Sequence, residues 1–311
     1  MDSQQQGHQH GPAGHAHGHG GGHGHGGGHG HGQVPAADFD WDAMAAHLEL
    51  EADLRADAVT EAGRWLSGLA GDGAVRRVLD VGAGPGVIAG LLAEVFPAAE
   101  VVAVDQSAAL LERARARSGG RLGTQQADLP EEFDKLGEAD LIWSGNAIHH
   151  LGDQQAALGA LAGRLRPGGL LAVAESGLPA RYLPRDFGLG RPGFQARMDA
   201  ANEDGFAAMR AELPDTTEEI EDWPAMLRRA GLRPGGTRTF LVDHPAPLTG
   251  PFREYLHTRL VRRHDQLTEV LGAEDRATLE VLIDREAPRG ILRRSDAFYL
   301  SAMTVHVGRR D

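Results

Sequence analysis

An acidic residue followed by three closely spaced glycines gives this sequence its first chemical signal. The stretch VLDVGAGPG begins at Val78 and places Asp80 two residues before Gly82, which Gly84 and Gly86 follow. Glycine lets a backbone turn sharply and approach a ligand closely, because a Cβ atom would collide there. A turn of this kind between an apolar strand and a helix predicts a nucleotide-binding loop.

A second acidic residue follows at the end of the next apolar run, EVVAVD. Asp105 lies about 20 residues beyond the glycines, where a carboxylate can accept hydrogen bonds from ribose hydroxyls. The dinucleotide fingerprint places its third glycine one residue later than this loop does, at the position of Val87. Ribose recognition is shared by several cofactors, so these residues leave the identity of the nucleotide open.

Two adjacent histidines in the stretch NAIHHL are candidates for a general base. Histidine exchanges protons near neutral pH, which suits the removal of a proton from a reacting group. We prefer His149 over His150 for this role. In the alternative interpretation, either ring caps or packs against the helix that follows.

The first 37 residues have a composition unlike the rest, with repeated His-Gly units and little to bury. We predict that residues 1–37 form a disordered tail, because too few apolar groups offset the entropy of ordering. Imidazole nitrogens bind nickel and zinc ions, and glycine lets several rings reach one ion. The predicted Ni²⁺ or Zn²⁺ ligands are His15, His17, His19, His23, His25, His29 and His31. A linker without a metal role is the alternative.

Composition limits the remaining possibilities. The chain has 311 residues, 41% of them hydrophobic, a formal net charge of −13 and no cysteine. The negative charge argues against nucleic acid as a partner, and the absence of cysteine excludes thiolate nucleophiles and disulfides. No apolar run approaches the roughly 20 residues that cross a bilayer, and no secretory signal is evident. We therefore expect a cytoplasmic protein without a membrane partner; the sequence leaves its oligomeric state open.

Apolar runs alternate with helical patterns from residue 75 to residue 175. Predicted helices begin after Ser107 and Asp153, whose side chains can cap the first turn. Another helix has Pro85 in its first turn, and Pro167 ends the helix that starts after Asp153. Strands and helices in alternation predict an α/β fold with a doubly wound, Rossmann-like, mostly parallel sheet.

The rest of the chain adds to this core without a second domain. We assign residues 38–311 to one domain, whose core comprises 75–175, 217–243 and 295–307. Asp222 caps a further helix within the core. The core is supplemented by helices over 38–69 and by insertions over 176–215 and 250–290. Because these additions are helical or irregular, we expect them to build the substrate pocket.

Five motifs in order give the chain a specific resemblance. The stretches VLDVGAGPG, VVAVDQS, QQADLP, DLIWSGNAIHHL and LRPGGLLAVAE resemble the class I S-adenosylmethionine-dependent methyltransferases, most closely those that act on small molecules, including the quinone-biosynthesis type. The resemblance is good over residues 75–175, looser over 217–243 and 295–307, and absent from 176–215 and 250–290.

The resemblance assigns site residues to S-adenosylmethionine. Asp80 and the three glycines would lie under its methionine part, Asp105 would bind its ribose, and Ser144 and Asn146 would contact the methionine end. The adenine would meet Asp128, Leu129 and Gln106, the last at a position where the family often has an apolar side chain.

The same resemblance limits the classes of molecule that could accept the methyl group. Cytosine-C5 methylation and arsenite methylation need cysteines, which are absent. The motif of DNA amino-methyltransferases and the paired-glutamate loop of protein arginine methyltransferases are also missing. A small organic acceptor remains, and we expect its methylation on oxygen by direct displacement with His149 as base; methylation on nitrogen or carbon is the alternative. A methyltransferase fold that serves metal delivery through its tail, and a nicotinamide-dependent oxidoreductase, are the alternatives.

Two further features bear on the acceptor pocket. The arginines of the first insertion could hold an acidic substrate, although a solvated charged surface is the simpler interpretation. Trp41 could cover the cofactor or anchor the first helix in the core. The arginines are Arg181, Arg185, Arg191 and Arg197.

Overall fold

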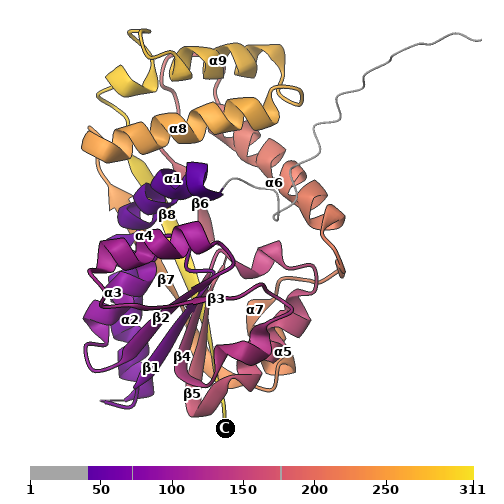
Figure 1. Ribbon diagram of the computed structural model, residues 1–311. Helices are drawn as coiled ribbons and strands as arrows, with labels where there is room; N and C mark the ends of the chain where they lie inside the picture. Colours follow the sequence, from indigo (N-terminus) through magenta and orange to yellow (C-terminus); the bar gives the residue numbers. More distant parts are fainter. Residues whose placement is uncertain (1–40, 72, 176) are drawn as a thin grey trace, which may run out of the picture. The chain divides into compact units, whose positions relative to one another are not determined.

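The computed structural model describes residues 41–71, 73–175 and 177–311, without the side chains of residues 41–43 (Figure 1). The helices are α1 (Trp41–Leu54), α2 (Ala56–Ala70), α3 (Val87–Val95), α4 (Ala108–Ser118), α5 (Gln154–Gly163), α6 (Phe194–Glu212), α7 (Trp223–Arg229), α8 (Gly250–Leu267) and α9 (Ala273–Ile283). The strands are β1 (Arg77–Val81), β2 (Glu100–Asp105), β3 (Gly123–Gln126), β4 (Ala139–Gly145), β5 (Leu165–Ala174), β6 (Gly177–Arg181), β7 (Arg233–His244) and β8 (Tyr299–Arg309). Our predictions for the tail, and for the side chain of Trp41, fall outside what is described.

The strands form one sheet that is parallel through its first five members. These run β3-β2-β1-β4-β5, and β8 then pairs antiparallel with β5. One edge of β8 pairs with β7 along its whole length, and β5 and β6 pair with successive parts of β8 on the opposite edge. The strand order reverses between β1 and β4, and ligands of such sheets bind at the carboxyl ends of the strands at this point.

Helices cover both faces of the sheet, as predicted for a doubly wound fold. Alternate residues of the buried strands enter two separate hydrophobic clusters, with Val78 and Trp143 in one and Leu79 and Ile142 in the other. Helices α2, α3 and α4 contribute to the first cluster, and α5 and α7 to the second. Burial on both faces explains why these strands are almost continuously apolar in sequence.

The additions to the core gather beyond the carboxyl ends of the parallel strands. Figure 1 shows α1, α8 and α9 stacked at this edge, and α1 packs on α8, which packs on α9. Helix α6 follows β6 in the first insertion and lies at the same edge (Figure 1). No helix among the described residues is long and apolar enough to cross a membrane.

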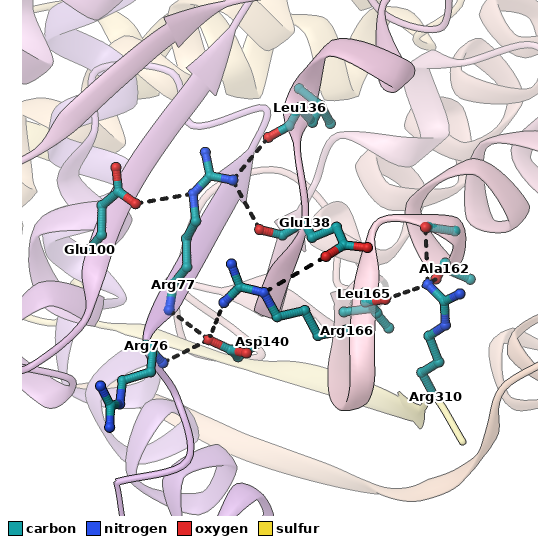
Figure 2. Close-up of polar contacts among 11 residues, drawn as sticks. Arg76, Arg77, Glu100, Leu136, Glu138, Asp140, Ala162, Leu165, Arg166 and Arg310 are labelled. Carbon is teal, nitrogen blue, oxygen red and sulfur yellow. Dashed lines mark hydrogen bonds and ion pairs between the residues drawn. The ribbon is translucent and has the colours of Figure 1, made fainter.

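A network of hydrogen bonds connects the strands at the opposite, amino-terminal edge of the sheet (Figure 2). The Asp140 carboxylate accepts hydrogen bonds from the backbone nitrogens of Arg76 and Arg77 at 2.8 Å each, and from the Arg166 guanidinium at 3.0 Å. The Arg77 guanidinium donates in turn to the Glu138 carbonyl at 2.9 Å. These contacts join the starts of β1, β4 and β5 at the end of the sheet remote from the glycine loop.

The predicted helix caps are confirmed, whereas the predicted positions of two prolines in helices are wrong. The Ser107 hydroxyl accepts a hydrogen bond from the third residue of α4, and Asp153 and Asp222 cap α5 and α7 in the same way. Pro85 precedes α3, which begins only after Gly86 in a left-handed conformation. Pro167 lies inside β5, which starts at Leu165, so it does not end α5. The pairing of β5 with β4 is irregular in register near this point.

Candidate active site

The glycine loop lies between β1 and α3 and is held against β2. The backbone nitrogens of Gly82 and Ala83 both donate to the Val104 carbonyl at 2.9 Å. Gly82, Gly84 and Gly86 have φ angles of 75°, 54° and 73°, which side chains rarely adopt. The loop therefore has the sharp turn that the sequence predicted.

The three glycines differ in what a side chain at each position would contact. A Cβ atom on Gly82 would lie 2.4 Å from the Ala147 Cβ, and one on Gly86 would lie 2.5 Å from the Ala114 Cβ. A Cβ on Gly84 would meet nothing within 4 Å. The expectation that a ligand excludes all three side chains is thus corrected, because the protein itself excludes two of them. Gly84 alone borders open space.

Asp105 ends β2 beside this loop. Its carboxylate accepts hydrogen bonds from the backbone nitrogens of Gly84 at 2.8 Å and Ser107 at 2.9 Å. Burial raises the pKa of the Asp105 carboxyl above its usual value. A carboxylate has about four acceptor positions, so Asp105 can accept a further bond from a ligand.

Asp80 lies in β1, two residues before the glycine loop, and is deeply buried. Only 2% of the residue is exposed, and its Oδ2 has no hydrogen-bond partner among the described residues. Burial, and secondarily the charge of Asp105, raise the pKa of Asp80 to about 7. Buried polar atoms without a partner are uncommon in folded proteins and call for an explanation. A cationic ligand group, reached directly or through a water molecule, would provide one.

The end of β4 carries the two residues assigned to the methionine end of the cofactor. Ser144 lies within the strand rather than after it, is fully buried, and donates its hydroxyl to the Val81 carbonyl at 3.3 Å. Asn146 is exposed and has a φ angle of 50°, unusual for a residue other than glycine. Strained backbone of this kind concentrates at functional sites. The Ser144 hydroxyl thus links two strands, whereas Asn146 faces outward.

The sequence analysis missed Glu175, which proves central to the geometry. Glu175 follows β5 and is 3% exposed. Its Oε1 accepts hydrogen bonds from the backbone nitrogens of Ala147 and Ile148 at 2.9 Å each, and its Oε2 lies 2.7 Å from the Nδ1 of His149. An acid at the carboxyl end of a buried parallel strand was the only signal in the sequence.

Helix α6 holds the same histidine loop from the other side. Arg210 donates to the carbonyls of His149 at 2.8 Å and Leu151 at 2.6 Å, and to the Gly152 carbonyl at 3.3 Å. The Phe206 ring packs edge-on against the His149 ring, with centroids 5.4 Å apart. The insertion therefore fixes both the backbone and the ring of His149. The sequence predicted the residue but not this support.

The residues predicted around the adenine lie at the carboxyl ends of β2 and β3. Gln106 is exposed, and its carbonyl accepts a hydrogen bond from the Gln126 amide at 2.9 Å. Asp128 is also exposed, and Leu129 is half-buried against the second hydrophobic cluster. The structure thus brings all three to one edge, and their contact with adenine stays a prediction.

The arginines of the first insertion are mostly engaged in ion pairs. Arg181 pairs with Asp199, and Arg197 forms a two-pronged contact with Asp275 at 2.6 Å for each oxygen. Arg191 lies 3.6 Å from the same Asp275 carboxylate. These pairs support the simpler interpretation of a charged surface over that of an acid-binding site.

The tail histidines assigned to metal lie outside the described residues. Within residues 41–71, 73–175 and 177–311, no group of three or more histidine or acidic side chains could hold a metal ion. Of the scattered histidines, His47 stacks on Tyr255 at 4.7 Å, and burial lowers the pKa of His47 to about 4. His257 bonds the Ile283 carbonyl at 2.8 Å. Both rings are held by contacts within the protein.

A sheet in this order, with a glycine turn after β1 and an acid ending β2, is the arrangement that the resemblance to class I methyltransferases predicted. Residues 78–169 match the family model described as a methyltransferase domain. The chain thus carries an S-adenosylmethionine-dependent methyltransferase domain of class I over these residues.

Curated relatives match about a third of the chain. The trans-aconitate 2-methyltransferase of Deinococcus radiodurans is 38% identical over 117 residues, 38% of this chain and 44% of that protein. The enzyme of the same name from Methylobacterium radiotolerans is 42% identical over 100 residues, covering 32% and 38%. The match spans less than half the length of these curated relatives. An O-methyltransferase family protein of Burkholderia thailandensis aligns at 16% identity and a TM-score of 0.41, covering 82% of this chain and 59% of that one.

Proposed function

We propose that this protein transfers a methyl group from S-adenosylmethionine to an oxygen of a small organic acceptor, with His149 as general base. The pairing of His149 with buried Glu175 at 2.7 Å carries the proposal. It lies at the carboxyl ends of β4 and β5, next to the strand-order reversal where such sheets bind ligands.

The residues around the glycine loop fit the cofactor. The ammonium of its methionine part would satisfy the Asp80 oxygen that has no partner. Gly84 leaves open space for backbone contact, and Asp105 retains acceptor positions for ribose hydroxyls. When bound, S-adenosylmethionine supplies a methyl group on a positively charged sulfur that an acceptor oxygen can displace.

The chain's own residues would remove the acceptor's proton. Glu175 has no proton to give when ionised, so the Nδ1 of His149 donates to it and the lone pair remains on Nε2. A ring held in this tautomer can accept the hydroxyl proton as the carbon–oxygen bond forms. Arg210 and Phe206 limit movement of the loop and ring, so the base is positioned before the acceptor binds.

Labelled methyl transfer tests the proposal directly. The protein is incubated with methyl-labelled S-adenosylmethionine and a small-molecule extract freed of protein and nucleic acid. We expect label in a low-molecular-weight product whose methyl group resists mild alkali if it is an ether and leaves if it is an ester. Binding of the cofactor without transfer to any small molecule, or label only on added macromolecules, contradicts the proposal.

A further inference from the structure

A cavity of about 310 Å³ opens beside Asn146, at the edge of the sheet that carries the candidate site. Its walls come from β6, β8, α6 and α8. Because Asn146 also borders the predicted methionine end of the cofactor, the cavity is placed where an acceptor would lie. Its lining combines apolar side chains such as Met198 and Leu260 with a group of arginines.

Two of these arginines lie one turn apart on α8. Arg259 and Arg263 both line the cavity, four residues apart and therefore on the same helix face. Neither forms an ion pair with a carboxylate among the residues that the structure describes. Their hydrogen bonds go to neutral groups, from Arg259 to the Tyr255 hydroxyl at 3.4 Å and from Arg263 to the Gln266 amide oxygen at 3.2 Å.

Other charges in the cavity wall are already balanced or lie at its rim. Arg55 pairs with Glu51 at 2.7 Å, and Asp199 pairs with Arg181. Glu203 is exposed. The two arginines of α8 thus leave an excess of positive charge on one side of the cavity.

The charge of Glu51 acts favourably on Arg259 but is shared with Arg55, so Arg263 is the less compensated of the two arginines. Like charges four residues apart on a helix repel each other, and burial together with the charge of Arg259 lowers the pKa of Arg263 to about 10. An oxyanion between the guanidinium groups would remove the repulsion and accept charge-assisted hydrogen bonds from both.

We propose that the acceptor carries an oxyanion, a carboxylate or a phosphate monoester, which Arg259 and Arg263 bind. The role of the ligand as methyl acceptor rests on the function proposed above, whereas the anion site itself does not. The anionic end lies against α8, and the acceptor extends along the cavity toward Asn146. The charge of this site comes from the second insertion rather than from Arg181, Arg191 and Arg197 of the first, which pair with acidic side chains.

Calorimetric titration with matched acids and amides tests the anion site. The probes are benzoate and benzamide, succinate and succinamide, and phenyl phosphate, which separates phosphate from carboxylate recognition. We expect at least one anion to bind ten-fold or more tighter than its neutral counterpart. Loss of one charged hydrogen bond should weaken that binding by about 10- to 100-fold in Arg263→Gln. The control Arg262→Gln removes the same charge one residue away, outside the cavity lining, and should stay within about threefold.

Three outcomes overturn the anion site: equal binding of acids and amides, no binding of any anion at millimolar concentration, or unchanged anion affinity in Arg263→Gln. If Arg263→Gln fails to fold, Arg259→Lys provides the second variant. Lysine keeps the charge but not the two-pronged geometry, so anion affinity should still fall.

S-adenosylhomocysteine is titrated into the same samples. Its failure to bind the parent protein contradicts the proposed function and leaves the anion test intact.

Discussion

Replacing Asp80 with asparagine should have opposite effects on folding and on cofactor binding. Asp80 is buried, and its pKa is raised from 3.8 to about 7. The folded state therefore holds a proton there that the unfolded state has lost over the interval from about pH 4 to pH 7. Stability due to this group is present below pH 4, falls as the pH rises through 7, and stays low above it.

The size of the effect follows from the shift in pKa. A difference of three pH units corresponds to ~4 kcal/mol of unfavourable free energy for the ionised group at high pH. Asparagine avoids this charge but can leave an amide proton without a partner, which costs about 1–3 kcal/mol. We therefore expect Asp80→Asn to raise the free energy of unfolding by roughly 1–3 kcal/mol at pH 8 and to lower or leave it unchanged at pH 4.

Denaturant titrations across pH 4 to 9 measure this difference, with the exposed Asp134→Asn as control. Cofactor affinity should move the other way. S-adenosylhomocysteine carries the same ammonium, so its binding to the parent protein should tighten as the pH rises through 7, and Asp80→Asn should bind it more weakly with a flatter pH profile. A variant less stable than the parent at pH 8, with its pH dependence unaltered between 4 and 7, would refute the reasoning.

Four further predictions concern separate parts of the molecule. Asp105→Ala should weaken S-adenosylhomocysteine binding roughly ten- to several-hundred-fold by calorimetry, because one or two charged hydrogen bonds are lost; unchanged affinity removes it from the site. His149→Gln should lower kcat for an identified acceptor by about 10²–10⁴-fold while cofactor affinity stays within a few-fold; a rate within about threefold of the parent leaves it a packing role. Asp140→Ala should reduce the free energy of unfolding by about 1–3 kcal/mol, since two backbone donors lose their acceptor, without altering cofactor affinity at the opposite edge. Deleting residues 1–32 should abolish high-capacity Ni²⁺ or Zn²⁺ binding in equilibrium dialysis, and a loss of cofactor binding with it would show that the tail is structural.

The parallel core was predictable because its signals are local. Buried strands are continuous apolar runs, and the caps at Ser107, Asp153 and Asp222 act within three residues of their own positions. Pro167 misled because proline usually ends helices, whereas here the chain has already entered a strand whose register is irregular at this point.

The local geometry of the candidate site was predictable only where one sequence motif contains both a residue and the groups that it contacts. The glycine loop and Asp105 satisfied that condition. Glu175 did not, because its partner His149 lies 26 residues away, and no spacing rule links them. The arginines were harder still: Arg197 finds Asp275 across 78 residues, so its charge is cancelled by a pairing that only the tertiary fold reveals.

Through Arg210, one helix contacts both the cavity and the loop that carries His149. Helix α6 forms a wall of the cavity with Met198, Asp199 and Asn202. It also carries Arg210, whose guanidinium donates hydrogen bonds to the carbonyls of His149 and Leu151. A helix that shifts to admit a larger acceptor must carry the histidine loop with it. A substitution that displaces α6 should therefore also move the histidine loop, whereas one that only shortens a cavity side chain such as Met198 should leave the loop in place.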